Sequence, residues 1–369
     1  MRDQADVKAR AGKVNVMVLA ERKQPRDTFV LVRGVWDKHG DKVTPDVPKA
    51  LTPWPADAPR DRLGLARWLT APENPLAGRV AVNHLWQMLF GQGLVRTSED
   101  FGLQGERPSH PELLDWLAVD LVKHGWDLKR TLKLIVMSRT YRQDSAVSAA
   151  LLAKDPENRL LARGARFRLP SWMIRDGALR SAGLFNPVLG GPPVRPYQPD
   201  GVWEELFMGR FKYEASEGPA QYRRTLYAFW RRSIAPTFLF DSAQRRSCEV
   251  RTGRTNTPLQ ALTLQNDATY LESSQAIAAE LLREGGDATR IQSLFRRVLS
   301  REANDQEAAL LGRTLMKARD HYRAQPAAAA QFLRVGQRVH ADGADLSELA
   351  AWTVVASLTL NLDEAITHE

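Results

Sequence analysis

Three side chains with anion-binding chemistry are clustered in residues 251–262 (RTGRTNTPLQAL). Arg251 and Arg254 carry guanidinium groups, and Asn256 adds an amide a short distance further on. We expect these side chains to lie beside a helix N-terminus, where free backbone N–H groups already favour anions. The pattern indicates an anion-binding corner. The alternative is structural, since the arginines can equally pair with carboxylates or cap neighbouring helices.

The helix start that would position this corner is predicted by three residues. Thr257 is a suitable N-cap, and Pro258 suits the first helical position because its missing N–H is not needed there. Gln260 stands three residues after the cap, so Thr257 and Gln260 predict a capping box.

A second candidate site lies on a proline-rich loop, residues 186–200, which contains five prolines and two glycines. An arginine, two aromatic rings and two carboxylates lie on or just after it: Arg195, Tyr197, Asp200, Trp203 and Glu204. This combination suits a sugar or an acidic polymer. The alternative is an arginine–carboxylate clamp that holds the loop to the helices, with the nearby aromatic rings packed in the core.

Catalysis is the rival interpretation of the same residues. Asp200, Glu204 or Asp267, acting with Arg254 and His84, could perform general acid–base chemistry on a glycosidic bond, as in a hydrolase or lyase of complex carbohydrates. The spacing does not show that any two of these groups meet. His84 also falls within an apolar helical segment, where a histidine is commonly a core residue.

Other common chemistries find no motif in this sequence. Cys248 is the single cysteine, so an intramolecular disulfide, a Cys-x-x-Cys pair and a covalent haem motif are excluded. The histidines lack metal-pair spacing, and there is no P-loop, dinucleotide fingerprint or Gly-x-Ser-x-Gly elbow. We expect neither a metal nor a cofactor on this chain.

Charge and hydropathy narrow the range of partners. The net charge of +9 favours acidic partners, but the basic residues are scattered in short pairs rather than gathered in a stripe, which argues against nucleic-acid binding. No apolar run is long enough for a transmembrane helix, and the first residues are charged and lack an apolar signal core.

The elements that must position these residues are mostly helical. Residues 14–20 and 28–34 read as two short strands, and prolines between residues 45 and 59 indicate an extended linker. We therefore expect a lead-in over residues 1–60 and a helical domain over 61–369, with a subdivision near 185–255 as a further option. The fold class is mainly α, an irregular array of helices with a small strand lead-in and a long proline-rich loop.

Helical periodicity and capping residues locate the main helices. In the first half they begin near Leu63, Val80, Ser109, Leu128, Asp155 and Ser171. In the last third they cover residues 258–282, 289–299, 304–321 and 346–360.

Several of these segments together resemble a planctomycete-specific domain, catalogued as domain of unknown function 1553. The segments that carry the resemblance are residues 74–95 (NPLAGRVAVNHLWQMLFGQGLV), 100–105 (DFGLQG), 110–117 (HPELLDWL), 138–142 (SRTYR), 155–161 (DPENRLL), 191–204 (GPPVRPYQPDGVWE), 254–261 (RTNTPLQA) and 361–364 (NLDE). The resemblance extends from about Asp61 to the end of the chain.

The resemblance implies a context rather than an activity. Similar domains usually form the C-terminal part of exported proteins that begin with a cytochrome-c-like domain, so haem c is expected only on a fused domain or partner outside this chain. A periplasmic or other extracytoplasmic location is implied in the same way. The expected function is therefore a binding or scaffold module of a cytochrome-associated system that recognises polysaccharide or another anionic ligand.

Overall fold

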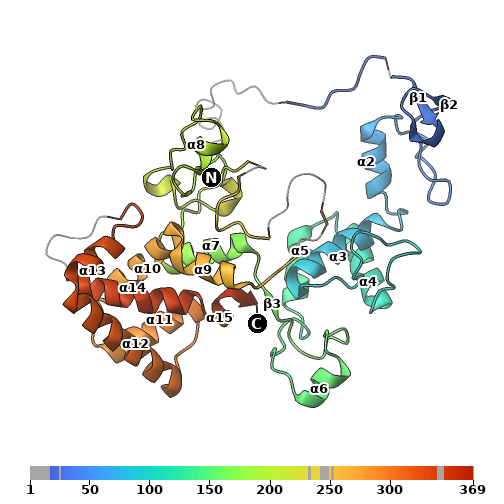
Figure 1. Cartoon of the computed structure of the whole chain (residues 1–369). Coiled ribbons are helices and arrows are strands. Elements are labelled where there is room, and N and C mark those ends of the chain that lie inside the picture. The colour runs from blue at the N-terminus through green and yellow to red at the C-terminus, as the bar shows by residue number, and fades with distance from the viewer. Residues whose placement is uncertain are drawn as a thin grey trace, which may run out of the picture. The chain divides into compact units, whose positions relative to one another are not determined.

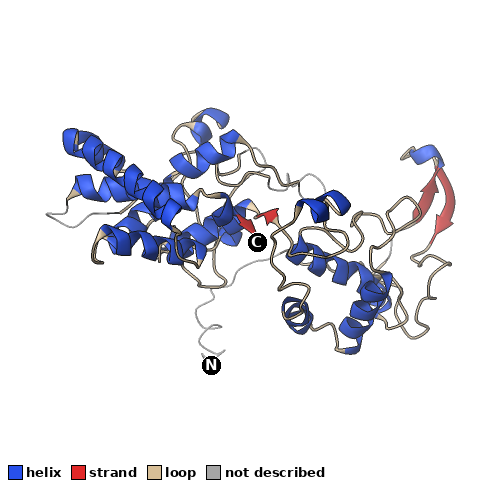
Figure 2. Cartoon of the chain, turned by 90° about the horizontal axis from the view of Figure 1, so that it is seen from below, coloured by secondary structure: helices blue, strands red, loops and turns tan. Residues whose placement is uncertain are grey.

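The computed structural model of the chain describes residues 17–24, 26–231, 234–241, 249–250, 253–338 and 345–368. Within these ranges it contains fourteen α-helices, while its strands form two small antiparallel sheets of two strands each. Helices account for most of the regular structure in Figure 2. The predicted mainly α fold class is confirmed. None of the described helices is long and apolar enough to cross a membrane.

The chain divides into two compact units. Unit 1 consists of residues up to Asn83 together with His110–Thr131, and unit 2 consists of His84–Ser109 together with Leu132–Glu369. The boundary expected after residue 60 falls inside unit 1.

Unit 1 begins with a strand hairpin, β1 (Thr28–Leu31) and β2 (His39–Val43), in which Thr28 pairs with Val43. Residues 28–34 were expected to form a strand and do so only up to Leu31, after which Val32–Gly34 form a 3-10 turn. The strand expected over residues 14–20 is wrong in its described part, because Met17–Ala20 have no regular structure and are exposed to solvent.

Three helices complete unit 1: α2 (Arg62–Thr70), α4 (Pro111–Lys123) and the first half of α3 (Ala77–Phe90). The carboxylate of Asp61 accepts a hydrogen bond from the backbone N–H of Gly64 at 2.9 Å and so caps α2. Helices α3 and α4 approach closely at Gly78, where a β-carbon would lie 3.3 Å from the carbonyl oxygen of Ala118.

Unit 2 contains the other helices, which Figure 1 labels along the chain. They are α5 (Leu128–Val136, shared with unit 1), α6 (Ala149–Lys154), α7 (Ser171–Ser181), α8 (Val202–Leu206), α9 (Pro258–Asn266), α10 (Ala268–Leu281), α11 (Asp287–Leu299), α12 (Asp305–Ala324), α13 (Pro326–Phe332), α14 (Leu346–Leu360) and α15 (Asp363–Ile366). A second strand pair, β3 (Phe167–Arg168) and β4 (Thr367–His368), joins the middle of the chain to its C-terminal end.

The core of unit 2 is centred on α14, which lies between α10 and α12 (Figure 1). Ala350, Ala351 and Ala356 are fully buried on α14 beside Trp352, and such small side chains allow close helix approach. The guanidinium of Arg319 binds the carboxylates of both Asp287 and Glu348, so it links α12 to α11 and α14.

Two of the helix predictions need correction. Asp155 does not open a helix: it follows α6, and its carboxylate accepts hydrogen bonds from the N–H groups of Arg159 and Leu160, which closes a turn instead. The helix expected over residues 258–282 is interrupted at Asp267, whose extended backbone ends α9 and whose carboxylate caps α10. At Asp155 the carboxylate that was expected to cap a helix closes a turn, and at Asp267 local capping wins over apolar periodicity.

Candidate functional site

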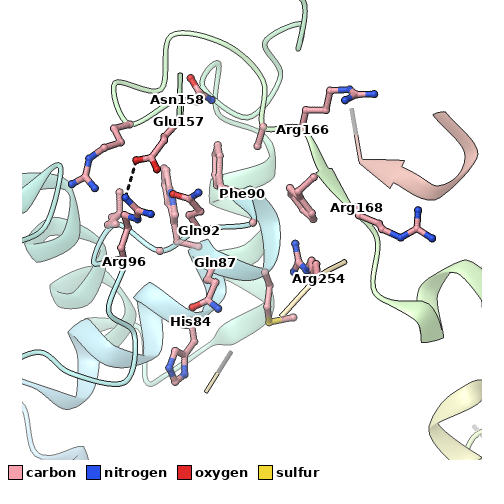
Figure 3. A pocket seen from close by; sticks show the side chains of 18 of the residues that line it. His84, Gln87, Phe90, Gln92, Arg96, Glu157, Asn158, Arg166, Arg168 and Arg254 are labelled. Atoms are coloured by element: carbon pink, nitrogen blue, oxygen red, sulfur yellow. Dashed lines mark hydrogen bonds and ion pairs between the residues drawn. The ribbon is translucent and has the colours of Figure 1, made fainter. Parts of the chain in front are cut away.

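A pocket of about 910 Å3 opens within unit 2 (Figure 3). Its walls come from the second half of α3, the loop that follows it, the turn after α6, the β3 segment with the start of α7, and the segment before α9. The polar and aromatic side chains on these walls are His84, Trp86, Gln87, Phe90, Gln92, Arg96, Ser109, Glu157, Asn158, Arg159, Arg166, Phe167, Arg168, Trp172 and Arg254.

Among the described residues the charge of the lining is strongly positive, since five arginines and a single carboxylate, that of Glu157, contribute to it. Three of the arginines have carboxylate partners. Arg96 pairs with Glu157 at 2.7 Å, Arg159 pairs with Glu106 at 3.0 Å, and Arg166 pairs with Asp363. The other two, Arg168 and Arg254, form no ion pair with any residue that the structure describes.

Arg254 stacks on an aromatic ring instead of pairing with a carboxylate. Its guanidinium carbon lies 4.5 Å from the ring centroid of Phe167, a cation–π arrangement. The side chain as a whole is exposed, yet the atoms packed around the guanidinium lower the pKa of Arg254 by desolvation. Arginine nevertheless stays protonated in proteins, so this group offers a positive charge and five N–H donors.

Phe167 is held in place by a series of aromatic contacts. The ring of His368 stacks on it with centroids 4.9 Å apart. His368 is fixed in turn by contacts of its two ring nitrogens, at 3.0 Å from the carbonyl oxygen of Ala165 and 3.0 Å from the hydroxyl of Tyr141. Gly91 allows the ring to approach the end of α3, because a β-carbon at this position would lie 2.7 Å from Phe167.

Arg168 links the pocket to the turn that carries Arg254. Its Nη1 donates a hydrogen bond of 3.1 Å to the side-chain oxygen of Asn256, and its guanidinium carbon lies 5.7 Å from the ring centroid of Phe240. Burial lowers the pKa of Arg168, while Asp241 and Asp363 oppose that shift. In Figure 3 the guanidinium of Arg168 points away from the Arg96–Glu157 pair.

Neutral groups complete the lining. The amide side chains of Gln87, Gln92 and Asn158 lie around the Arg96–Glu157 pair (Figure 3). Trp172 lines the pocket with 49 % of its surface exposed. The Nε2 atom of His84 is buried and has no hydrogen-bond partner among the described residues.

The structure places the ten candidate residues from the sequence in different surroundings. His84 and Arg254 line the pocket, and Asn256 reaches it through Arg168. Arg251 lies outside the described residues. The carboxylate of Asp267 caps α10 and also accepts a hydrogen bond from the hydroxyl of Thr237.

The remaining five candidates belong to the proline-rich loop and α8, and none of them lines the pocket. Trp203 is fully buried, packed against Phe207, Phe211, Tyr213 and Phe229, so the aromatic density around it is core. The guanidinium of Arg195 lies 5.8 Å from the ring of Phe211. Asp200 is exposed and Glu204 is partly exposed.

Tyr197 is engaged with a buried carboxylate. Its hydroxyl donates to Glu272 at 2.8 Å, and Tyr222 donates to the same carboxylate at 2.9 Å. The backbone N–H of Gln337 is a third donor, at 2.8 Å. Desolvation, followed by the charge of Glu272, raises the pKa of Tyr197 well above its usual range. These contacts fasten the proline-rich loop to α10.

Sequence reasoning missed Phe167, Arg168 and Trp172. A signal was available for the first two, because Arg166, Phe167 and Arg168 alternate basic and aromatic side chains, as on the two faces of a strand. No pattern in the sequence connects them with Arg254, which lies far along the chain. Among the described residues, no group of three or more histidine, cysteine, aspartate or glutamate side chains could hold a metal ion.

Comparison with known proteins gives a family without an activity. Residues 61–315 match the family model PSD1, described as a protein of unknown function (DUF1553). No curated protein and no solved structure matches the chain.

Proposed function

The chain belongs to the PSD1 family, and we propose that its pocket in unit 2 binds an anionic ligand, with Arg254 as the principal contact. The observation that carries this proposal is the stacked guanidinium of Arg254, which lines the pocket without a carboxylate partner among the described residues. A partly desolvated cation of this kind favours an anion from outside the chain.

The ligand class that best suits the lining is an acidic polysaccharide. An arginine binds a carboxylate or sulfate through two parallel hydrogen bonds, the amides of Gln87, Gln92 and Asn158 suit hydroxyl groups, and the exposed indole of Trp172 offers a flat apolar surface to a sugar ring. The chain would thus act as a recognition module.

Two further expectations stay predictions. Association with a cytochrome-c-like partner in an extracytoplasmic compartment is implied by the family resemblance alone. A hydrolase or lyase activity would need carboxylates in the pocket, and Asp200, Glu204 and Asp267 do not line it, while Glu157 is paired with Arg96.

The test is a binding titration with an oligogalacturonide and with the same oligosaccharide fully methyl-esterified, which removes the charge and keeps the rings. We expect the acidic form to bind and the ester to bind at least about tenfold more weakly, since one charge-assisted contact contributes about 1.5–3 kcal/mol. Equal binding of both forms, or of neither, would contradict the proposal.

The net charge of +9 requires a control for non-specific attraction. Arg254→Ala and Arg313→Ala remove the same charge, but Arg313 is exposed on α12 and does not line the pocket. We expect Arg254→Ala to abolish the preference for the acid and Arg313→Ala to preserve it. A Glu204→Gln variant should bind like the unmodified protein.

A further inference from the structure

We propose that Asp241 is a positioning residue that holds Arg254 over Phe167, and this inference rests on the proposed binding function. Asp241 is not among the described residues that line the pocket, and it is hydrogen-bonded to Thr255, the residue next to Arg254. Its role would be to fix the direction of the anion contact rather than to touch the ligand.

The contacts between Asp241 and Thr255 involve both the backbone and the side chain. The carboxylate accepts a hydrogen bond from the backbone N–H of Thr255 at 2.8 Å and from its hydroxyl at 2.9 Å. Because Thr255 follows Arg254 directly, these bonds restrain the backbone from which the guanidinium projects.

Gln260 completes the arrangement from inside helix α9. Its buried side chain donates to the hydroxyl of Thr255 at 2.7 Å and to the carboxylate of Asp241 at 3.2 Å. The oxygen of the same Gln260 amide accepts a hydrogen bond from the backbone N–H of Thr257 in the capping box. The turn before α9 is therefore tied both to its own helix and to Asp241.

The direction in which anion affinity changes when the charge of Asp241 is removed distinguishes a positioning role from a purely electrostatic one. Asp241 is a negative group close enough to Arg168 to affect its pKa, so it should repel an anionic ligand. Removing its charge would strengthen anion binding if electrostatics alone mattered. If Asp241 positions Arg254, Asp241→Asn should instead weaken binding. Asparagine suits the test because it also tolerates the left-handed backbone of this residue, φ 57°.

The experiment compares Asp241→Asn with Asp363→Asn, which removes a carboxylate paired with Arg166 and leaves the turn intact. With the oligogalacturonide as probe, we expect about fivefold weaker binding for Asp241→Asn, the effect of one lost hydrogen bond, and unchanged or tighter binding for Asp363→Asn. Binding by Asp241→Asn that equals or exceeds that of the unmodified protein would overturn the inference.

A second pair of variants leaves the charge unchanged. Thr255→Val removes the hydroxyl at nearly constant volume, and Thr255→Ser retains it. We expect the valine variant to bind about fivefold more weakly and the serine variant to bind normally. If Arg254→Ala abolishes binding but Thr255→Val does not weaken it, the positioning role fails while the proposed function stands.

A spectroscopic measurement tests the inference without any ligand. The Arg254 Nε–H resonance should be shifted upfield by the ring current of Phe167, and Arg254→Ala identifies it. We expect Asp241→Asn and Thr255→Val to reduce this shift and Thr255→Ser to retain it. An unchanged shift in Asp241→Asn and Thr255→Val would overturn the positioning role, whether or not the protein binds an acidic sugar. Absence of acidic-sugar binding would refute only the proposed function.

Discussion

The guanidinium carbon of Arg254 lies 4.5 Å from the centroid of the Phe167 ring, and this contact joins the segment before α9 to strand β3. Both residues line the pocket. Arginine can lie over an aromatic ring and bind a carboxylate at once, because its N–H donors lie at the edge of the guanidinium plane.

Replacing Arg254 with lysine should test whether planarity matters as well as charge. Lysine keeps the charge but loses the stacked plane and the paired N–H donors. We expect Arg254→Lys to bind an oligogalacturonide about fivefold to tenfold more weakly, from the loss of about 1–1.5 kcal/mol of stacking and hydrogen bonding. Calorimetric titration measures the change, and equal affinity would show that Arg254 acts only as a point charge.

Substituting Gly91 should disturb the pocket by displacing Phe167. Gly91 has φ 77°, and an added β-carbon would lie 2.7 Å from the ring. We expect Gly91→Ala to lower the free energy of unfolding by about 2 kcal/mol or more, from backbone strain and from the displaced ring.

The matched control is Gly312→Ala in helix α12, where nothing lies within 4 Å of the new methyl group. That substitution should stabilise the protein by about 0.5–1 kcal/mol, because alanine loses less backbone entropy in a helix. Chemical denaturation of both variants measures the change in the free energy of unfolding. An unchanged value for Gly91→Ala would show that Phe167 can move freely.

The helix start at Thr257 has a predictable energetic weight. The Thr257 side chain accepts a hydrogen bond from the backbone N–H of Gln260, and the backbone N–H of Thr257 donates one to the side-chain oxygen of Gln260. We expect Thr257→Ala to cost about 1 kcal/mol of stability and Thr257→Ser to cost much less. Thermal melts compare the two variants. Equal melting temperatures for Thr257→Ala and Thr257→Ser would show that the side-chain cap does not stabilise the helix start.

Acid should weaken the linkage between α11, α12 and α14. The hydrogen bond from Arg319, and then its charge, lower the pKa of Asp287. A carboxyl group whose pKa is lower in the folded state stabilises the fold above its unfolded pKa, which is about 3.9, and loses that effect as the pH falls through the folded pKa. We therefore expect Asp287→Asn to be less stable than the unmodified protein at pH 6, with the difference shrinking below about pH 4.

Urea denaturation from pH 6 to pH 3 measures this dependence. Asp305→Asn is the control, since Asp305 is an exposed acidic residue in the first turn of α12 and forms no ion pair with the described residues. A difference for Asp287→Asn that stays constant down to pH 3 would show that the contact with Arg319 does not depend on the charge of Asp287.

The features that the sequence predicted well depend on neighbouring residues. The capping box predicted at Thr257 is confirmed, because it requires only side chains three positions apart on one turn of helix. The mainly α class follows from apolar periodicity in the same way. At Asp155 a capping signal was misinterpreted, because the carboxylate closes a turn instead. At Asp267 the continuous helix expected over residues 258–282 is interrupted, because the carboxylate caps α10.

The pocket itself depends on contacts between segments that are far apart in the sequence. Arg254 could be identified as an anion-binding candidate from its position before a helix, but its contact with Phe167 could not, because no local rule specifies which strand lies beside that turn. For Trp203, likewise, the sequence could not distinguish a core residue from a ligand-binding one. Its aromatic surroundings suit either a core or a ligand wall, and only its complete burial in the folded chain decides for the core. Short-range hydrogen bonding thus determines each turn and helix start, whereas burial and long-range packing decide which side chains are left available to a ligand.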